Sequence, residues 1–351
     1  VLYLINQYLF TIFIYKILNY WRNAMAISPV NVPKIFGDVP AFMGIDYDPN
    51  LKNTKADAII VGMPYDGIST FRGGATRRAP QEIRKYSLLF SSYNFDWDMH
   101  ALDYIKVLDC GDVDVLPGNT IESYKRLENR ISEIQNCNAV PIMMGGDHGV
   151  TFPGVKAVVR KTGGPTGFLL FDTHLDLSED FNNDLLTRAS PVKRILELDE
   201  IDKNRVAIIG CKGPRNLPEW TPLYKKLGLK VYSDREVQVR GIENVTREAL
   251  KIVSPDGKSP YISVDIDAID PAFAPGTNSI EPGGLTSREI INGVRIACEN
   301  GFCGFDLVEV SPDFDVKSGI TSTLAAKIIV EAICSLAALR CEKVGAWDFK
   351  Y

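Results

Sequence analysis

Acidic and imidazole side chains follow directly after one short apolar run of this 351-residue chain. The run at residues 167–171 ends, and Asp172, His174 and Asp176 then occupy alternate positions. Alternate residues of an extended segment point to the same side. We therefore expect two carboxylates and one imidazole to project together from the end of a strand.

Two further apolar runs end in the same way. Residues 261–264 precede Asp265 and Asp267, and residues 139–144 precede a Gly-Gly-Asp-His segment that ends at His148. The two glycines allow a tight turn between a strand and a helix. Binding sites of open α/β sheets lie beyond the carboxyl ends of the strands. The three segments are therefore predicted to bring six side chains to one place.

Four carboxylates and two imidazoles in one place require positive charge, because like charges this close cannot all ionise. Two divalent cations would neutralise the four carboxylates. A site dominated by oxygen ligands with some imidazole suits Mn²⁺ better than Zn²⁺. Two ions about 3.5–4 Å apart can activate a water between them. Each motif alone is weak evidence, but the three together indicate a centre for two metal ions.

The apolar runs that precede these side chains predict a parallel sheet covered by helices. The apolar runs are short, rich in β-branched and aromatic residues and mostly not alternating, which is typical of strands buried on both faces. They lie at 58–61, 105–108, 139–144, 167–171, 206–209, 229–232, 261–264, 304–308 and 343–347. Helices are predicted between them at 121–136, 153–161, 191–198, 247–252, 287–299 and 323–340. This alternation predicts an α/β fold, a three-layer α/β/α sandwich with a mostly parallel sheet.

Bulk composition narrows the partners and the compartment. The net charge of −5 argues against a nucleic-acid or anionic-membrane partner, since both need clustered Lys and Arg. The seven cysteines are scattered and form no C-x-x-C pair, which is typical of free thiols in a reducing compartment, so we expect a cytoplasmic protein. Residues 1–24 are interpreted as an appended apolar extension without a catalytic role, a membrane anchor being the alternative, and residues 25–351 as one catalytic domain.

The motifs resemble those of the ureohydrolase family of arginases and agmatinases. The resemblance covers the segments 145–148, 172–176 and 263–277, and continues through 283–286 and 306–309. Upstream, residues 62–66 and 71–75 resemble the first strand and Gly-rich loop of the family. The Ala-Phe-Ala-Pro-Gly-Thr segment at 272–277 is more similar to agmatinase than to arginase.

The resemblance implies an arginase-like fold, two Mn²⁺ ions per subunit and hydrolysis of a guanidino compound to urea and an amine, with agmatine to putrescine and urea as the leading reaction. It also implies a homo-oligomer, a trimer or hexamer. Carried over to this chain, one ion is held by His148, Asp172, Asp176 and Asp265, and the other by Asp172, His174, Asp265 and Asp267. Asp176 and Glu309 would be catalytic, Glu309 would pair with the substrate guanidinium, and Thr277 would line the pocket.

Two positions depart from the family pattern. Family members usually carry a proton-shuttling histidine where this chain has Thr187-Arg188-Ala189. Arg188 would place positive charge near the pocket mouth and favour a substrate that bears a carboxylate, unless its side chain points to solvent. His100 is too far upstream to replace the missing histidine and is expected to be a surface or packing residue. The second departure, Lys212 after Cys211, leaves substrate selectivity open.

Three other functions compete with agmatine hydrolysis. The first is hydrolysis of a guanidino acid of the guanidinobutyrate or arginine type, which Arg188 would favour. The second is a metal-binding but catalytically silent homologue, which the missing histidine favours and the six intact ligands oppose. The third is a deacetylase of related fold, but such enzymes use a His-His pair that the sequence lacks.

Overall fold

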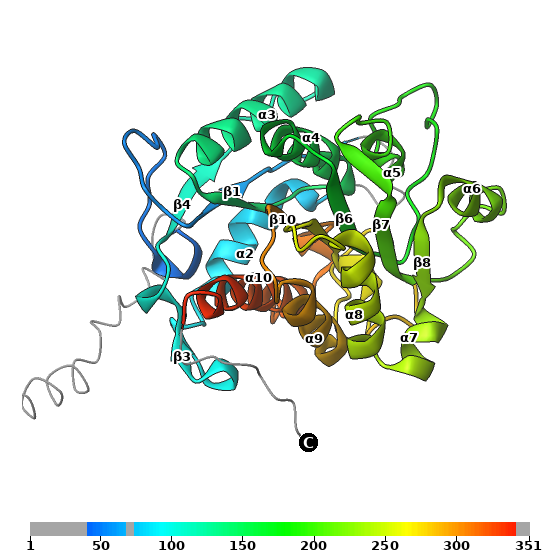
Figure 1. Ribbon diagram of the computed structural model, residues 1–351. Coiled ribbons are helices and arrows are strands. Elements are labelled where there is room, and N and C mark those ends of the chain that lie inside the picture. Colours follow the sequence, from blue (N-terminus) through cyan, green and yellow to red (C-terminus); the bar gives the residue numbers. More distant parts are fainter. Residues whose placement is uncertain (1–40, 68–73, 342–351) are drawn as a thin grey trace, which may run out of the picture.

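A wholly parallel sheet of eight strands forms the centre of the protein (Figure 1). The computed structural model describes residues 41–67 and 74–341. The strand order is β4-β1-β5-β10-β9-β6-β7-β8. The strands are β1 (Ala58–Gly62), β4 (Val107–Asp112), β5 (Val140–Met144), β6 (Thr166–Phe171), β7 (Ile201–Cys211), β8 (Lys230–Ser233), β9 (Tyr261–Asp265) and β10 (Gly304–Val308). A small antiparallel pair, β2 (Tyr93–Asn94) and β3 (Met99–His100), lies outside this sheet.

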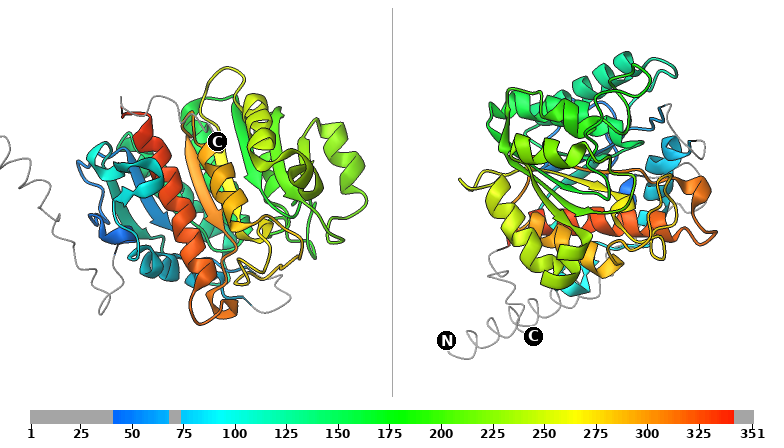
Figure 2. Two further views of the ribbon diagram at one scale, coloured as in Figure 1. Left: turned by 90° about the horizontal axis from the view of Figure 1, so that it is seen from below. Right: turned by 90° about the vertical axis from the view of Figure 1, so that its right-hand side faces the viewer.

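Helices cover both faces of the sheet, as Figures 1 and 2 show. One layer contains α3 (Thr120–Asn136), α4 (Thr151–Thr162), α5 (Pro191–Ile195) and α6 (Trp220–Leu227), and the other contains α2 (Ala79–Ser87), α7 (Asp234–Arg240), α8 (Ile242–Val253), α9 (Ser287–Ala297) and α10 (Ile320–Ala338). Successive strand residues enter opposite cores: Ile60 and Leu169 pack with the α10 layer, whereas Ile59 and Phe168 pack with the α3 layer. The predicted three-layer sandwich is therefore confirmed.

The strand order brings the three predicted motifs to neighbouring positions. The four central strands β5, β10, β9 and β6 lie side by side. Because all of them run in the same direction, their carboxyl ends meet at one edge of the sheet. Neighbouring strands of a sheet lie about 4.8 Å apart, so the segments that follow β5, β6 and β9 start close to one another. The topology alone thus places the acidic motifs in a single cluster.

Most predicted elements agree with the structure to within a few residues, and the differences have physical causes. The strand predicted at 105–108 is Val107–Asp112, and the helix predicted at 191–198 ends at Ile195. The sequence reading omitted α2, α6 and α7, which are 9, 8 and 7 residues long and therefore too short to show a clear helical period. The predictions for 1–24, for the strand at 343–347 and for residues 71–73 lie outside the described residues.

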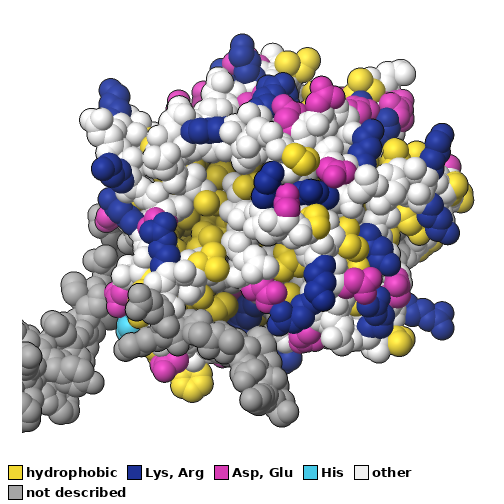
Figure 3. All heavy atoms as spheres, in the orientation of Figure 1, with side chains coloured by type: hydrophobic (Ala, Val, Ile, Leu, Met, Phe, Trp, Pro, Cys, Tyr) yellow, Lys and Arg dark blue, Asp and Glu magenta, His cyan; other side chains and the backbone are white. Residues whose placement is uncertain are grey.

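Helix α10 is the most apolar helix at the surface of the sheet. Among the described residues it is the one helix long and apolar enough by composition to cross a membrane, but 78% of that apolar window is buried inside the protein. Figure 2 shows it lying along the sheet next to α9. A core helix of a large α/β fold has these properties. Elsewhere on the face seen in Figure 3, Lys and Arg side chains alternate with Asp and Glu.

A capping box starts α9, where Glu289 follows Thr286 by three residues. The hydroxyl of Thr286 accepts a hydrogen bond from the backbone N–H of Glu289, and the Glu289 carboxylate accepts one from the backbone N–H of Thr286. This exchange satisfies two donors at the helix start that have no partner within the helix.

We expect Thr286→Ala to lower the free energy of unfolding by about 1 kcal/mol, because it removes the cap. Urea denaturation measured by circular dichroism tests this. Ser132→Ala, inside α3, is the control, since its hydroxyl bonds to a carbonyl within the helix and its loss should leave the midpoint unchanged or slightly higher. An equal loss in both variants would contradict the capping role.

A buried carboxylate links α10 to two other segments. Glu331 is fully buried, and its carboxylate accepts hydrogen bonds from Arg295 Nε at 2.6 Å and Trp97 Nε1 at 2.6 Å. Lys327 Nζ lies 2.5 Å away. Burial alone would raise the pKa of Glu331, but the contacts with Arg295 and Lys327 lower it to about 2.

A lowered pKa in the folded state makes stability depend on acid pH. The contribution of Glu331 is complete above its unfolded pKa near 4.5 and is lost as the pH falls toward 2. We expect the unfolding midpoint of the wild type to fall over this range, and Glu331→Gln to weaken that dependence while costing about 3–5 kcal/mol at neutral pH. Glu133→Gln, an exposed partner of Arg130, should cost about 0–1 kcal/mol. Identical acid profiles for Glu331→Gln and wild type would contradict the assignment.

Candidate metal centre

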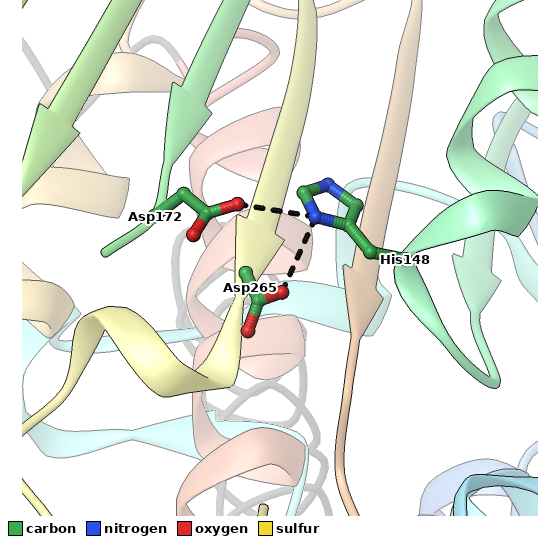
Figure 4. A group of neighbouring side chains, drawn as sticks. All are labelled: His148, Asp172 and Asp265. Atoms are coloured by element: carbon green, nitrogen blue, oxygen red, sulfur yellow. Dashed lines mark ion pairs between the residues drawn. The ribbon is translucent and has the colours of Figure 1, made fainter. Parts of the chain in front are cut away.

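Three of the predicted side chains meet beyond the ends of β5, β6 and β9. The imidazole Nδ1 of His148 lies 3.1 Å from Asp172 Oδ2 and 3.2 Å from Asp265 Oδ2. Figure 4 shows both carboxylates pointing toward this ring, Asp172 from the end of β6 and Asp265 from the end of β9. Asp176 approaches the same nitrogen, with its Oδ2 at 2.7 Å. This group of four is the one predicted to hold the first ion.

The second group shares one carboxylate with the first. His174 Nδ1 lies 3.2 Å from Asp267 Oδ2 and 3.5 Å from Asp172 Oδ1. Asp172 therefore directs one oxygen toward each imidazole, as a bridging ligand would. Asp265, the second predicted bridge, pairs with His148 in this geometry. The structure thus brings all six predicted ligand residues together, while their binding of metal remains a prediction.

The local backbone differs from the extended segments that the sequence reading assumed. Strand β6 ends at Phe171, the chain bends at residues 173 and 174, and Asp176 has a positive φ of 48°. The Asp172 carboxylate accepts the N–H of His174 at 2.6 Å, and the Asp265 carboxylate accepts the N–H of Asp267 at 2.8 Å. Each carboxylate therefore holds its own turn. The argument from alternating strand residues was wrong, although the side chains do converge.

Two glycines let the turn after β5 approach the neighbouring strands. A Cβ on Gly146 would lie 1.8 Å from the carbonyl oxygen of Tyr65, which follows β1, and a Cβ on Gly145 would lie 2.5 Å from the Val308 side chain of β10. No rotamer change relieves a clash with backbone. These positions require glycine, and the tight turn places His148 at the edge of the sheet, as predicted.

The carboxylates and imidazoles of the cluster shift one another's pKa values. Burial alone would lower the pKa of His148, but its hydrogen bonds with Asp172 and Asp176 raise it well above the usual value. The pKa of His174 is raised as well, chiefly by Asp267 acting against burial. Burial, together with the charge of Asp172, raises the pKa of Asp176 to about 6. These shifts show that the cluster favours added positive charge.

Buried polar atoms without partners indicate that a cation fits this cluster. Among the described residues, His148 Nε2, His174 Nε2 and Asp267 Oδ1 are buried and have no hydrogen-bond partner. His148, Asp172 and Asp265 offer ligand atoms that all lie within 4.8 Å of one another, and so do Asp172, His174 and Asp267. Unpaired buried polar atoms are costly, and the coordination of metal ions satisfies them. The residues present therefore fit two divalent ions.

Glu309 lies next to this cluster, directly after β10. It is buried, with 2% of its surface exposed, so it is not a strand-end carboxylate that faces solvent. Its Oε1 accepts the backbone N–H of His148 at 2.8 Å, and its backbone has a positive φ of 65°. A left-handed conformation of a residue other than glycine costs roughly 1–3 kcal/mol and is typical of functional sites. The adjacent Val310 pairs with Thr277, which is also buried.

Arg188 is buried beside Glu309, which excludes the alternative that it points to solvent. Only 9% of its surface is exposed, and its Nη1 donates to Glu309 Oε2 at 2.9 Å. Nη2 lies 3.4 Å from Asp66 Oδ1 and 3.6 Å from Asp147 Oδ2. Sequence reasoning missed Asp66 and Asp147 as members of the site. The same rule of acidic residues after strands would have found them, since they follow β1 and β5.

Lys212 packs next to the cluster, whereas His100 lies at the surface. Lys212, at the end of β7, donates from Nζ to the hydroxyl of Thr173 at 2.5 Å, so it packs on the turn that carries the ligands. His100 is exposed on β3, where its ring packs against Tyr93. It is therefore a surface residue, as expected, and no third histidine reaches the site.

A parallel α/β sandwich with paired carboxylates and imidazoles at the strand ends defines a class of metal-dependent hydrolases. A profile of the Arginase family matches residues 56–335, and the chain belongs to this family. It is an enzyme of the amidinohydrolase type, acting on guanidino compounds.

Relatives of known activity support this placement. The chain is 33% identical to guanidinopropionase of Pseudomonas aeruginosa over 314 residues, which is 89% of this chain and 95% of the relative. It is 34% identical to agmatinase of Bacillus subtilis over 286 residues, 80% of this chain and 91% of the relative. The solved structure of proclavaminate amidinohydrolase from Streptomyces clavuligerus superposes with a TM-score of 0.79 at 31% identity, covering 86% of this chain and 98% of that one.

The shared position of Asp172 predicts different metal losses from different ligand variants. The proteins are loaded with Mn²⁺ and then dialysed to remove unbound metal. We expect the wild type to retain about two ions per chain, Asp267→Ala about one and Asp172→Ala fewer than one. Elemental analysis of the purified protein tests this. Glu179→Ala, which removes an exposed carboxylate, should retain the wild-type content. Equal metal contents in all four proteins would show that these residues are not ligands.

Proposed function

We propose that this protein hydrolyses a guanidino compound to urea and an amine with the help of two Mn²⁺ ions. The observation that carries the proposal is the convergence of the six donor side chains next to a buried carboxylate, Glu309, that already binds a guanidinium group. Membership of the arginase family supports the same reaction. Manganese is proposed because oxygen atoms dominate the donor set.

A guanidinium carbon is a poor electrophile because its positive charge is spread over three nitrogens. Two bound cations would supply an activated water by lowering its pKa from about 15.7 toward about 7. Asp172 and Asp265, at the ends of neighbouring strands, would hold those cations in place. The site thus provides attack at neutral pH without a nucleophilic side chain.

Residues of the chain would bind the substrate and manage its protons. Glu309 would orient the planar guanidinium through paired, charge-assisted hydrogen bonds. Asp176, whose pKa burial raises to about 6, would accept the hydrogen bond of the attacking water. With no histidine in the place of Arg188, a chain of water molecules would carry the proton to the leaving amine. General acid–base help of this kind contributes typically about 10²–10⁴-fold.

The tail of the substrate has two candidates. The sequence of residues 272–277 favours agmatine, which carries an amine. The buried position of Arg188 favours a guanidino acid, which carries a carboxylate. Relatives with names of both kinds match the chain at nearly equal identity, so they do not decide between the two. The choice depends on the charges around Glu309.

Urea release with Mn²⁺ across agmatine, arginine, guanidinobutyrate and guanidinopropionate tests the reaction. We expect at least one of these compounds to yield urea, and Glu309→Gln to lower kcat/KM by roughly 10- to 100-fold, the value of a hydrogen bond to a charged group. Asp176→Asn should lower kcat as well.

The exposed variant Glu179→Gln is the control and should keep wild-type kinetics. A protein that retains two Mn²⁺ ions but releases no urea from any of the four compounds would be the catalytically silent homologue. That result would contradict the proposed function while leaving the metal centre intact.

A further inference from the structure

The site already contains a guanidinium group, that of Arg188. Its Nη1 donates to Glu309 Oε2 at 2.9 Å, which is a full charge-assisted hydrogen bond. The other oxygen of Glu309 is occupied by the backbone N–H of His148. Each oxygen of this carboxylate therefore already accepts one hydrogen bond, and a second guanidinium bound to Glu309 would lie beside the like charge of Arg188.

The rest of the Arg188 guanidinium is held less firmly. Nη2 lies 3.4 Å from Asp66 and 3.6 Å from Asp147, which are longer than good hydrogen bonds. The charges of Glu309, Asp147 and Asp66 raise the pKa of Arg188 against the opposing effect of burial, so it stays charged. If Nη1 left Glu309, the side chain would still lie between two carboxylates. The guanidinium can therefore move without losing all its partners.

One donor of Arg188 has no acceptor. More than nine-tenths of the residue is buried, and its Nε has no hydrogen-bond partner among the described residues. An unsatisfied buried donor on a charged group is costly, and structures usually supply a partner for it. A carboxylate accepts hydrogen bonds well from two adjacent donors of one guanidinium. The open Nε–H thus indicates a place for an anion beside Glu309.

From these contacts we propose that Arg188 determines selectivity by occupying Glu309 until a substrate exchanges with it. The guanidinium of the substrate takes the place of Arg188 on Glu309, and the carboxylate of the substrate takes the place of Glu309 on Arg188. This inference rests on the proposed function, since it assumes that the substrate guanidinium binds at Glu309.

The exchange favours a guanidino acid over agmatine. With a guanidino acid, both buried charges remain paired, because each gains an opposite charge for the one it loses. With agmatine, Arg188 loses Glu309 and receives no anion, and the amine tail adds a further positive charge nearby. Arg188 would then keep only its longer contacts with Asp66 and Asp147, and the loss of its closest partner from a buried charge is destabilising. The predicted substrate class is therefore a linear guanidino acid.

A crystal structure of the wild-type protein with Mn²⁺ and 4-guanidinobutyrate tests the exchange directly. We expect the ligand guanidinium on Glu309, and the ligand carboxylate on Arg188 through Nε and an Nη. A ligand that binds while the Arg188–Glu309 pair stays intact would overturn the proposal, whatever the activity of the enzyme.

Calorimetric binding of guanidinium chloride isolates the first half of the exchange, because this cation has no tail. Arg188→Met should bind guanidinium at least about 10-fold more tightly than the wild type. In the wild type the Arg188 side chain occupies Glu309 most of the time, and the apparent affinity falls in proportion to the fraction of molecules in which Glu309 is free. Glu309→Gln should remove the binding. Arg194→Met is the matched control, because Arg194 is equally buried but pairs with Glu179 and Glu197 away from the site. Equal affinity in Arg188→Met and wild type would overturn the proposal.

Kinetics with two tails isolate the second half. The wild type should prefer guanidinobutyrate to agmatine in kcat/KM, and Arg188→Met should lose or reverse this preference, mainly through KM. If Arg188→Met does not fold, Arg188→Lys is the second variant, because it keeps the positive charge. It should prefer the acid less strongly than the wild type does, because a lysine cannot form the paired contact. A wild type that prefers agmatine contradicts the inference alone, whereas a wild type that hydrolyses neither compound contradicts the proposed function.

Discussion

Repulsion between carboxylates at the ends of parallel strands is the constraint on which this structure depends. Asp172, Asp176, Asp265 and Asp267 are buried within a few ångströms of two imidazoles, in a position where their charges cannot all exist without compensating cations. The cluster therefore favours the binding of positive charge, which metal ions would supply.

The sheet makes such a cluster possible by holding it rigidly. Central strands with apolar residues on both faces fix the starting points of the turns, and the carboxylates of Asp172 and Asp265 then hold the turns themselves. Gly146 allows the His148 turn to touch the segment after β1, and Glu309 accepts the N–H of His148 from the opposite side. The carboxylate proposed to bind the substrate and a residue proposed to bind metal thus share one backbone hydrogen bond.

The sequence predicted the sheet and the membership of the cluster well, because both depend on local patterns. Buried parallel strands produce apolar runs, and the residues after them need only a shared edge to meet. The local geometry of Asp172–Asp176 was predicted wrongly, since the turn depends on hydrogen bonds made by the carboxylates and not on strand alternation. The sequence predicted Arg188 near the pocket, but its contacts with Glu309, Asp66 and Asp147 could not be predicted. Its burial follows from Glu309, Asp66 and Asp147, which lie far away in the sequence and meet it only in the folded chain.

Anomalous diffraction at the manganese edge, from crystals of the wild-type protein grown with Mn²⁺, tests the central claim most directly. The account predicts two peaks about 3.5–4 Å apart, on either side of Asp172, with His148 next to one and His174 next to the other. A single peak away from Asp172, or no peak in a protein whose side chains keep the described arrangement, would contradict it.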